Sequence, residues 1–136
     1  MTREILFKAK RLDNGEWVKG SLISFADGGR SILPSESAVL YKKGESLFST
    51  VNCLEVDPST LCQYTGLTDK NGVKIFEGDI LSYNGSREPV IFNTDLRIPC
   101  FTTGIGSGSS TPLHPYKLSK RHFVIGNIHD GEGGQR

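Results

Sequence analysis

Residues 61–81 of this 136-residue chain read LCQYTGLTDKNGVKIFEGDIL, the most regular alternation of apolar runs and turn residues in the sequence. Asn71-Gly72 and Glu77-Gly78 stand between the apolar runs, and Gly adopts without steric cost the positive φ angles that tight turns require. Short strands are therefore predicted over residues 61–67, 73–76 and 80–83. This central stretch indicates antiparallel β structure.

The segments on either side also favour strands. Residues 5–10 and 17–25 predict an N-terminal hairpin, because Asn14-Gly15 between them tolerates the two positive φ angles of a type I′ turn. Residues 57–60, Asp-Pro-Ser-Thr, predict a turn or one helical turn. Further strands are predicted over residues 38–41, 47–54, 90–93 and 122–128. No long segment has apolar residues at helical spacing.

Length and composition predict one small β domain. Hydrophobic residues make up 36% of the chain, enough for a modest core, and 16 Gly with 6 Pro favour turns. The predicted fold class is mainly β: an N-terminal β-hairpin region over residues 1–57 and a small barrel-like β domain over residues 58–136, with little helix, together one compact unit. We expect the last strand, around Val124–Ile128, to close the sheet against the central stretch. Residues 104–111 have the composition of a mobile loop.

Charge and hydropathy argue against two large classes of function. Lys and Arg number 16 against 15 Asp and Glu, and a net charge of +1 does not by itself predict binding to nucleic acid or to a membrane surface. No stretch approaches the roughly 20 apolar residues that span a bilayer, and the charged N-terminus does not resemble a signal peptide. We therefore expect a cytoplasmic protein with no membrane partner.

Cysteine and histidine spacing predicts no metal, cofactor or disulfide. The 3 Cys are odd in number and include no CxxC pair, and the 3 His have no HxxxH or HExxH spacing. The disfavoured alternative is a composite site of Cys62, Cys100 and one His, because free Cys is more often a small buried apolar residue.

Two motifs resemble those of a known family. The run QYTGLTDKNG, followed by IFEGDI, in residues 63–80 resembles the central signature of the YopX protein family, and Val124–Asp130, VIGNIHD, is similar to its second motif. Residues 3–9 and 17–20 also fit the family's opening. The resemblance implies a small β-rich protein encoded mainly by bacteriophages and prophages, acting in a bacterial host cell, and it supplies no catalytic residues. Cys62 and the Gly/Ser loop depart from the family pattern without touching its turns.

Most signature residues are expected to be structural. The signature residues are Gln63, Tyr64, Thr65, Gly66, Asp69, Asn71, Gly72, Glu77, Gly78, Asp79, Gly126 and Asn127. Asp69 can accept hydrogen bonds from backbone N–H groups of the turn that it opens. Phe76 and Ile80 are expected to pack into the core. Turn chemistry explains Gln63, Tyr64 and Glu77 less well.

Glu77 and Asp79 are the carboxylates on which an enzyme hypothesis would depend. At positions i and i+2 they can lie on one side of a strand and bind a divalent cation or divide acid and base roles. Turn chemistry plus a surface ion pair with Lys70 or Lys74 explains them more simply. No nucleophile accompanies them, and Gly104–Gly108 lacks the Lys-Ser/Thr that follows in a phosphate-binding loop. No catalytic residue is predicted.

A basic run near the C-terminus supports an alternative, binding of nucleic acid. Tyr116, Lys117, Lys120 and Arg121 are expected to lie near Tyr83 and Arg87, an arrangement in which bases stack on aromatic rings beside a positive groove. Lysines that guard an exposed strand edge explain the same residues. The favoured hypothesis is an accessory protein that binds another protein, or itself, through exposed strand edges.

Overall fold

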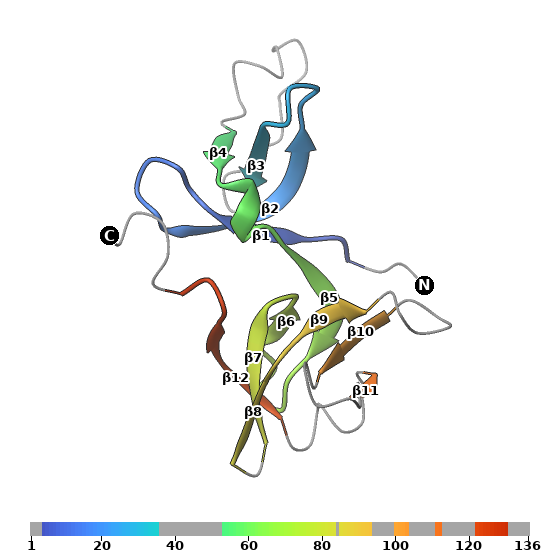
Figure 1. The fold of residues 1–136 in the computed structure, drawn as a ribbon. Coiled ribbons are helices and arrows are strands. Elements are labelled where there is room, and N and C mark those ends of the chain that lie inside the picture. Colours follow the sequence, from blue (N-terminus) through green and yellow to red (C-terminus); the bar gives the residue numbers. More distant parts are fainter. Residues whose placement is uncertain are drawn as a thin grey trace. The chain divides into compact units, whose positions relative to one another are not determined.

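The computed structural model describes residues 4–35, 53–83, 85–93, 100–103, 111–112 and 122–130. Regular structure within these ranges consists of antiparallel strands and short 3₁₀ turns, which confirms the predicted mainly β fold (Figure 1). The chain divides into two compact units, Ile5–Gln63 and Tyr64–Asp130, with Glu4 belonging to the second. The predicted strand over residues 38–41, most of that over 47–54 and residues 104–110 of the Gly/Ser loop lie outside the described residues.

The first unit is an antiparallel meander. It contains β1 (Phe7–Lys10), β2 (Trp17–Ser24), β3 (Arg30–Pro34) and β4 (Leu54–Val56), in the spatial order β4-β3-β2-β1. The first residues of β5 (Cys62–Thr68) pair with the other edge of β1, Gln63 with Phe7 and Cys62 with Lys8. Because side chains alternate along a strand, one face of this sheet buries Ala9, Ile32 and Val56 as its core.

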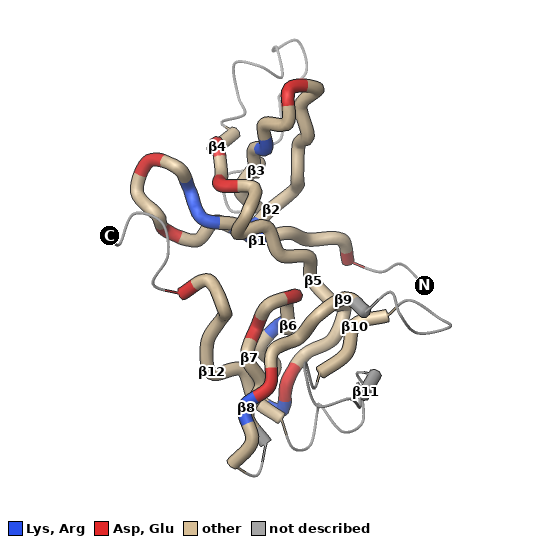
Figure 2. The backbone as a smooth tube through the Cα atoms, viewed as in Figure 1, with Lys and Arg blue, Asp and Glu red and all other residues tan. Residues whose placement is uncertain are grey.

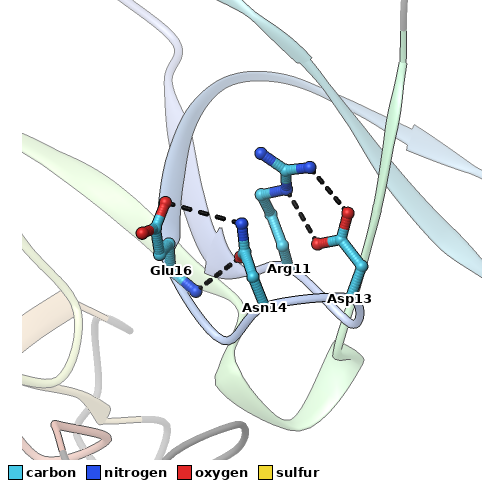
Figure 3. Close-up of polar contacts among 4 residues, drawn as sticks. All are labelled: Arg11, Asp13, Asn14 and Glu16. Carbon is cyan, nitrogen blue, oxygen red and sulfur yellow. Dashed lines mark hydrogen bonds and ion pairs between the residues drawn. The ribbon is translucent and has the colours of Figure 1, made fainter.

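The predicted N-terminal hairpin is confirmed, but its loop is longer than a type I′ turn. The amide of Arg11 donates to the carbonyl of Glu16 at 2.9 Å, so Leu12–Gly15 form the loop. Asn14 Oδ1 accepts from the amide of Glu16 at 2.9 Å (Figure 3). This side-chain bond competes with the backbone pattern of a two-residue turn, which accounts for the longer loop.

The same loop carries an exposed ion pair. The guanidinium of Arg11 donates to the two carboxylate oxygens of Asp13 at 3.0 and 2.6 Å (Figure 3). These hydrogen bonds hold the pKa of the Asp13 carboxyl below its ordinary value of 3.8. The contact is therefore present at neutral pH and is lost only in acid, as Asp13 takes up its proton.

Residues 57–60 form a helical turn, one of the two alternatives that the sequence predicts. The 3₁₀ helix η2 (Pro58–Thr60) begins after Asp57, whose Oδ1 accepts from the amide of Ser59 at 3.0 Å. The hydroxyl of the buried Thr60 accepts from the amide of Lys10 at 2.9 Å. This turn is thereby fastened to β1 just before the chain enters β5.

The second unit holds the rest of β5 and seven further strands. These are β6 (Lys74–Phe76), β7 (Asp79–Tyr83), β8 (Ser86–Pro89), β9 (Ile91–Asn93), β10 (Cys100–Thr103), β11 (Thr111–Pro112) and β12 (Phe123–Asn127). β5 pairs with β6, β7 lies between β12 and β8, and β10 lies between β11 and β9. Ile75, Leu81 and Val90 form its buried core. The described strands form open sheets, without a ladder that closes them into a barrel.

The last strand pairs with the central stretch, as the sequence predicts. β12 runs antiparallel to β7, from the pair Phe123–Ser82 to the pair Asn127–Asp79. β3, β8, β10 and β11 were not predicted, and the predicted Gly/Ser loop extends to Thr111, which lies in β11. Ser-Arg-Glu-Pro in β8 contains no apolar run and enters the sheet by backbone pairing with β7. Within the described ranges, no helix is long and apolar enough to cross a bilayer.

Candidate functional site

Asp69 joins the central turn to the last strand. Its Oδ1 accepts from the amides of Asn71 at 2.8 Å and Val73 at 2.9 Å, which confirms the predicted side-chain-capped turn. Its Oδ2 accepts from the amide of Val124 at 2.9 Å, a contact across 55 residues that sequence reasoning did not anticipate. Asp69 is only 3% exposed, so one buried carboxylate holds both the turn and the start of β12.

Asp79 makes the second link between the two signature motifs. Its Oδ2 accepts from the amide of Phe76 at 2.8 Å, and its Oδ1 accepts from Asn127 Nδ2 at 2.9 Å. Asn127 Oδ1 in turn accepts from the amide of His129 at 2.9 Å. Gly78 has a φ of 85°, and a Cβ there would lie 3.2 Å from Asn127 Nδ2, so both its conformation and its space favour glycine.

This network engages Asp79, one of the two carboxylates of the enzyme hypothesis. Asp79 is 1% exposed, and its carboxylate accepts hydrogen bonds from a backbone amide and from an asparagine side chain. Of the two lysines expected to form an ion pair with these carboxylates, Lys74 Nζ lies 3.5 Å from Glu4 Oε1 and Lys70 Nζ lies over the ring of Phe123. In the part of the chain that the structure describes, no three His, Cys, Asp or Glu side chains gather as a metal site would require. The geometry gives the Asp79 carboxylate a structural role.

The other signature residues support the turns and the core. The ring centroid of the buried Tyr64 lies 5.5 Å from that of Phe76, and the hydroxyl of Thr65 donates to the carbonyl of Ile75 at 2.8 Å. Gly66, like Gly72, has a positive φ. Gln63 of β5 pairs with Phe7 of β1, and Glu77 is half-buried. Tyr64 is thus explained by aromatic packing, which the turn pattern alone did not reveal.

Alternation along β7 separates the core from an outer sheet face. Leu81 is buried in the core, so Ile80 and Ser82 lie on the opposite face. The expectation that Ile80 packs into the core is therefore wrong, since the Glu77-Gly78-Asp79 turn sets Leu81 inward and Ile80 outward. The register of β12 against β7 shifts between Val124 and Gly126, which places Ile125 in a bulge and leaves it 43% exposed.

A shallow groove of about 400 Å³ lies on this outer face. Its lining is mostly apolar, with one cation and one carboxylate: Ile80, Arg87, Pro89, Ile125, Gly126, Asn127, Ile128 and Asp130. Ile128, just past the end of β12, is 49% exposed. We call this feature the β12 groove. Sequence reasoning missed this groove, because most of its residues come from three different strands and Ile125 is exposed only because it lies in the bulge.

The edge of β12 is less available than its face. The amide of Val124 donates to Asp69, and the carbonyl of His122 accepts from the amide of Lys70 at 3.0 Å. The main-chain groups at the start of this strand are therefore already engaged. A partner strand cannot add there without displacing Asp69, so the face offers the open surface.

A second, smaller cleft of about 110 Å³ is lined by Leu81, Ser86, Glu88, Thr103 and His122. It brings a carboxylate and an imidazole to one place, but its volume matches only a few water molecules at about 30 Å³ each. It has no apolar surface comparable with that of the β12 groove.

The basic residues predicted to bind nucleic acid, Tyr116, Lys117, Lys120 and Arg121, lie outside the described residues. Tyr83 ends β7, opposite Ser86. Among the described residues, Figure 2 shows basic and acidic positions mixed along the chain.

Comparison with known proteins agrees with the two motifs that meet in this network. The family model described as YopX protein matches residues 6–132. The chain belongs to the YopX family. The resemblance read from residues 63–80 and Val124–Asp130 is thereby confirmed. No curated protein matches this YopX chain.

One solved structure resembles this YopX-family chain along its whole length. It is the crystal structure of protein EF1440 from Enterococcus faecalis, with 22% sequence identity and a TM-score of 0.57. The alignment covers 99% of this chain and 100% of that chain. At this identity the likeness concerns the fold.

Replacing Asp69 with Asn is expected to release β12 while the turn survives. Asparagine can keep Oδ1 as the acceptor for Asn71 and Val73, but its Nδ2 then faces the amide of Val124, which loses its acceptor. We expect the free energy of unfolding to fall by about 2 kcal/mol and the Val124 amide to exchange roughly tenfold faster, measured by hydrogen exchange.

Asp27→Asn is the matched control for this variant. Asp27 also opens a turn, and its Oδ1 accepts from the amide of Gly29 at 2.9 Å, but it is exposed and, within the described part of the chain, bonds no distant strand. It should change neither quantity by a measurable amount. Unaltered exchange at Val124 in Asp69→Asn would show that the link to Asp69 does not hold the strand.

Proposed function

We propose that this YopX-family chain is a non-enzymatic module that binds another protein through the β12 groove. The observation that carries the proposal is the pair of isoleucines, Ile125 and Ile128, exposed at 43% and 49% on one groove. Exposed apolar groups gathered in a concave, polar-rimmed surface are typical of protein interaction sites.

The buried network supports this proposal, because it fixes the strand that presents the isoleucines. Asp69 holds Val124 before the bulge, and Asp79 holds Asn127 after it. A surface that is rigid before binding loses little conformational entropy when a partner arrives. On this proposal the residues of both signature motifs position the groove and take no part in chemistry.

The setting that family resemblance implies belongs to the same proposal. We infer an accessory protein encoded by a bacteriophage or prophage, at work in the cytoplasm of the bacterial host. Its partner is then a protein of the host or of the phage.

Affinity capture from a bacterial lysate, with nuclease added to half of each sample, tests the proposal. The wild-type chain is compared with the double variant I125D/I128D and with Val73→Asp. Val73 is a matched control, because it is also an exposed apolar residue, at 47%, but lies outside the groove. All three proteins should melt within a few degrees of one another, since surface substitutions change stability by about 0.5 kcal/mol.

The expected result is a discrete protein that survives nuclease, is captured by wild type and Val73→Asp, and is lost with I125D/I128D. Capture that is equal for all three proteins would overturn the role of the groove. Captured material that disappears with nuclease would favour the alternative function, nucleic-acid binding by Tyr116, Lys117, Lys120 and Arg121. Binding of that kind should weaken steeply as salt rises.

A further inference from the structure

The outer face of the β12–β7–β8 sheet carries two parallel rows of side chains. Ser82 pairs with Phe123 on one side and with Arg87 on the other, so these three residues lie side by side on one face. Lys70 Nζ lies over the ring of Phe123, 4.8 Å from its centroid, and extends the row. We call Lys70, Phe123, Ser82 and Arg87 the cationic row.

The second row crosses the sheet at Ile80, two residues before Ser82 in β7. Ile80 pairs with Gly126 on one side and with Pro89 on the other. We call these three residues the apolar row. Ile125 and Ile128 extend its apolar surface within the β12 groove. Two residues of a strand span about 6.6 Å, which is therefore the spacing between the two rows.

The groove lining holds one cation, Arg87, and one carboxylate, Asp130. Arg87 is exposed, and within the described ranges its guanidinium forms no ion pair or hydrogen bond. The carboxylate in the groove belongs to Asp130, whose Oδ2 already accepts from the amide of Asn127 at 2.9 Å. Arg87 presents a planar fork of donors that matches the geometry of a carboxylate.

We propose that the β12 groove binds an extended protein segment with the pattern aliphatic-x-acidic. The aliphatic side chain lies on the apolar row beside Ile125 and Ile128, and the Asp or Glu two residues away pairs with Arg87. In an extended segment, residues i and i+2 point to the same side about 6.6 Å apart, which matches the spacing of the two rows. This inference rests on the proposed function and names the partner chemistry of the same site.

A second copy of the chain fits this face less well than an acidic segment does. Face-to-face association would bring Lys70 and Arg87 of each copy toward a surface that carries the same cations, and like charges that meet in an interface cost affinity. The test below therefore includes the oligomeric state.

Selection from a random 12-residue peptide library displayed on phage tests the proposal. The library is panned separately on the wild-type chain, on Arg87→Glu, on I125D/I128D and on Lys19→Glu. Lys19 is an exposed lysine of β2 that does not line the groove. Lys19→Glu therefore makes the same change of charge as Arg87→Glu without altering a groove residue. Sedimentation of wild type and I125D/I128D without peptide gives the oligomeric state.

We expect wild type and Lys19→Glu to select the same aliphatic-x-Asp/Glu pattern. Arg87→Glu should keep the aliphatic preference but select Lys or Arg at the third position, and it should bind the wild-type peptides at least about tenfold more weakly. I125D/I128D should select no common pattern.

The other possible outcomes would overturn this inference, alone or together with the proposed function. Groove-dependent peptides with an aliphatic residue but no acidic preference, bound equally by Arg87→Glu, would overturn this inference and leave the proposed function standing. Wild type that selects no pattern lost in I125D/I128D would remove the groove as a binding site and with it both proposals. A wild-type dimer that I125D/I128D breaks would identify the occupant as a second copy and overturn the inference.

Discussion

Replacing Gly20 with Ala is expected to lower the free energy of unfolding by about 3 kcal/mol or more, because the added methyl group has no room. Gly20 pairs with Phe7 of β1 and with Pro34 of β3, in the middle of the first unit's sheet. A Cβ at this position would collide with the carbonyl oxygen of Leu33 and would lie 2.9 Å from the Cα of Pro34. Both neighbours are backbone atoms, so relief requires β2 and β3 to move apart.

Urea denaturation of Gly20→Ala measures this loss, with Ser21→Ala as the control. Ser21 is the next residue of β2 and is exposed, so its variant should stay within about 0.5 kcal/mol of wild type. A loss of about 3 kcal/mol is a large share of the 5–15 kcal/mol typical of a folded domain. Equal stability of the two variants would show that β2 and β3 do not approach so closely at Gly20.

Asp79→Asn is expected to cost about 3 kcal/mol, although it changes hardly any volume. Asp79 Oδ2 accepts from the amide of Phe76 and Asp79 Oδ1 accepts from Asn127 Nδ2, so each oxygen has a donor of its own. An asparagine amide has one oxygen, so in either orientation its NH₂ group faces a donor and leaves a buried hydrogen bond unmade. A hydrogen bond to a charged group contributes about 1.5–3 kcal/mol, and an unsatisfied buried donor adds a penalty of similar size.

Glu77→Gln provides the control for Asp79→Asn, because it removes the same charge two residues earlier in the same turn. Glu77 is half-buried, and its side chain forms no hydrogen bond to another strand among the residues that the structure describes. We expect Glu77→Gln to denature within about 0.5 kcal/mol of wild type. Because Asn127 lines the β12 groove, Asp79→Asn should also weaken capture of the partner, while Glu77→Gln should not.

Features that depend on neighbouring residues could be predicted from the sequence. The Asp69 carboxylate caps amides two and four residues away, and Asp57 caps the amide of Ser59, so both turns follow from local chemistry. The strands that flank the central turns, and the family motifs themselves, are likewise short-range patterns. Even the N-terminal hairpin was predicted, and its loop differed because one Asn14 side chain bonds the Glu16 amide.

Features that depend on which strands meet could not be predicted in the same way. Asp69 and Val124 are 55 residues apart, and Asp79 and Asn127 are 48 residues apart, so no periodicity connects them. β8 has no apolar run and becomes a strand only because β7 offers backbone partners. The β12 groove combines Ile80, Arg87 and Ile125 because pairing register and one bulge set their directions, and a shift by one residue would turn each to the opposite face. Local chemistry thus settled the turns and the strands that contain apolar runs, whereas β8 and the β12 groove exist only through the pairing and register of β12 and β8 on β7.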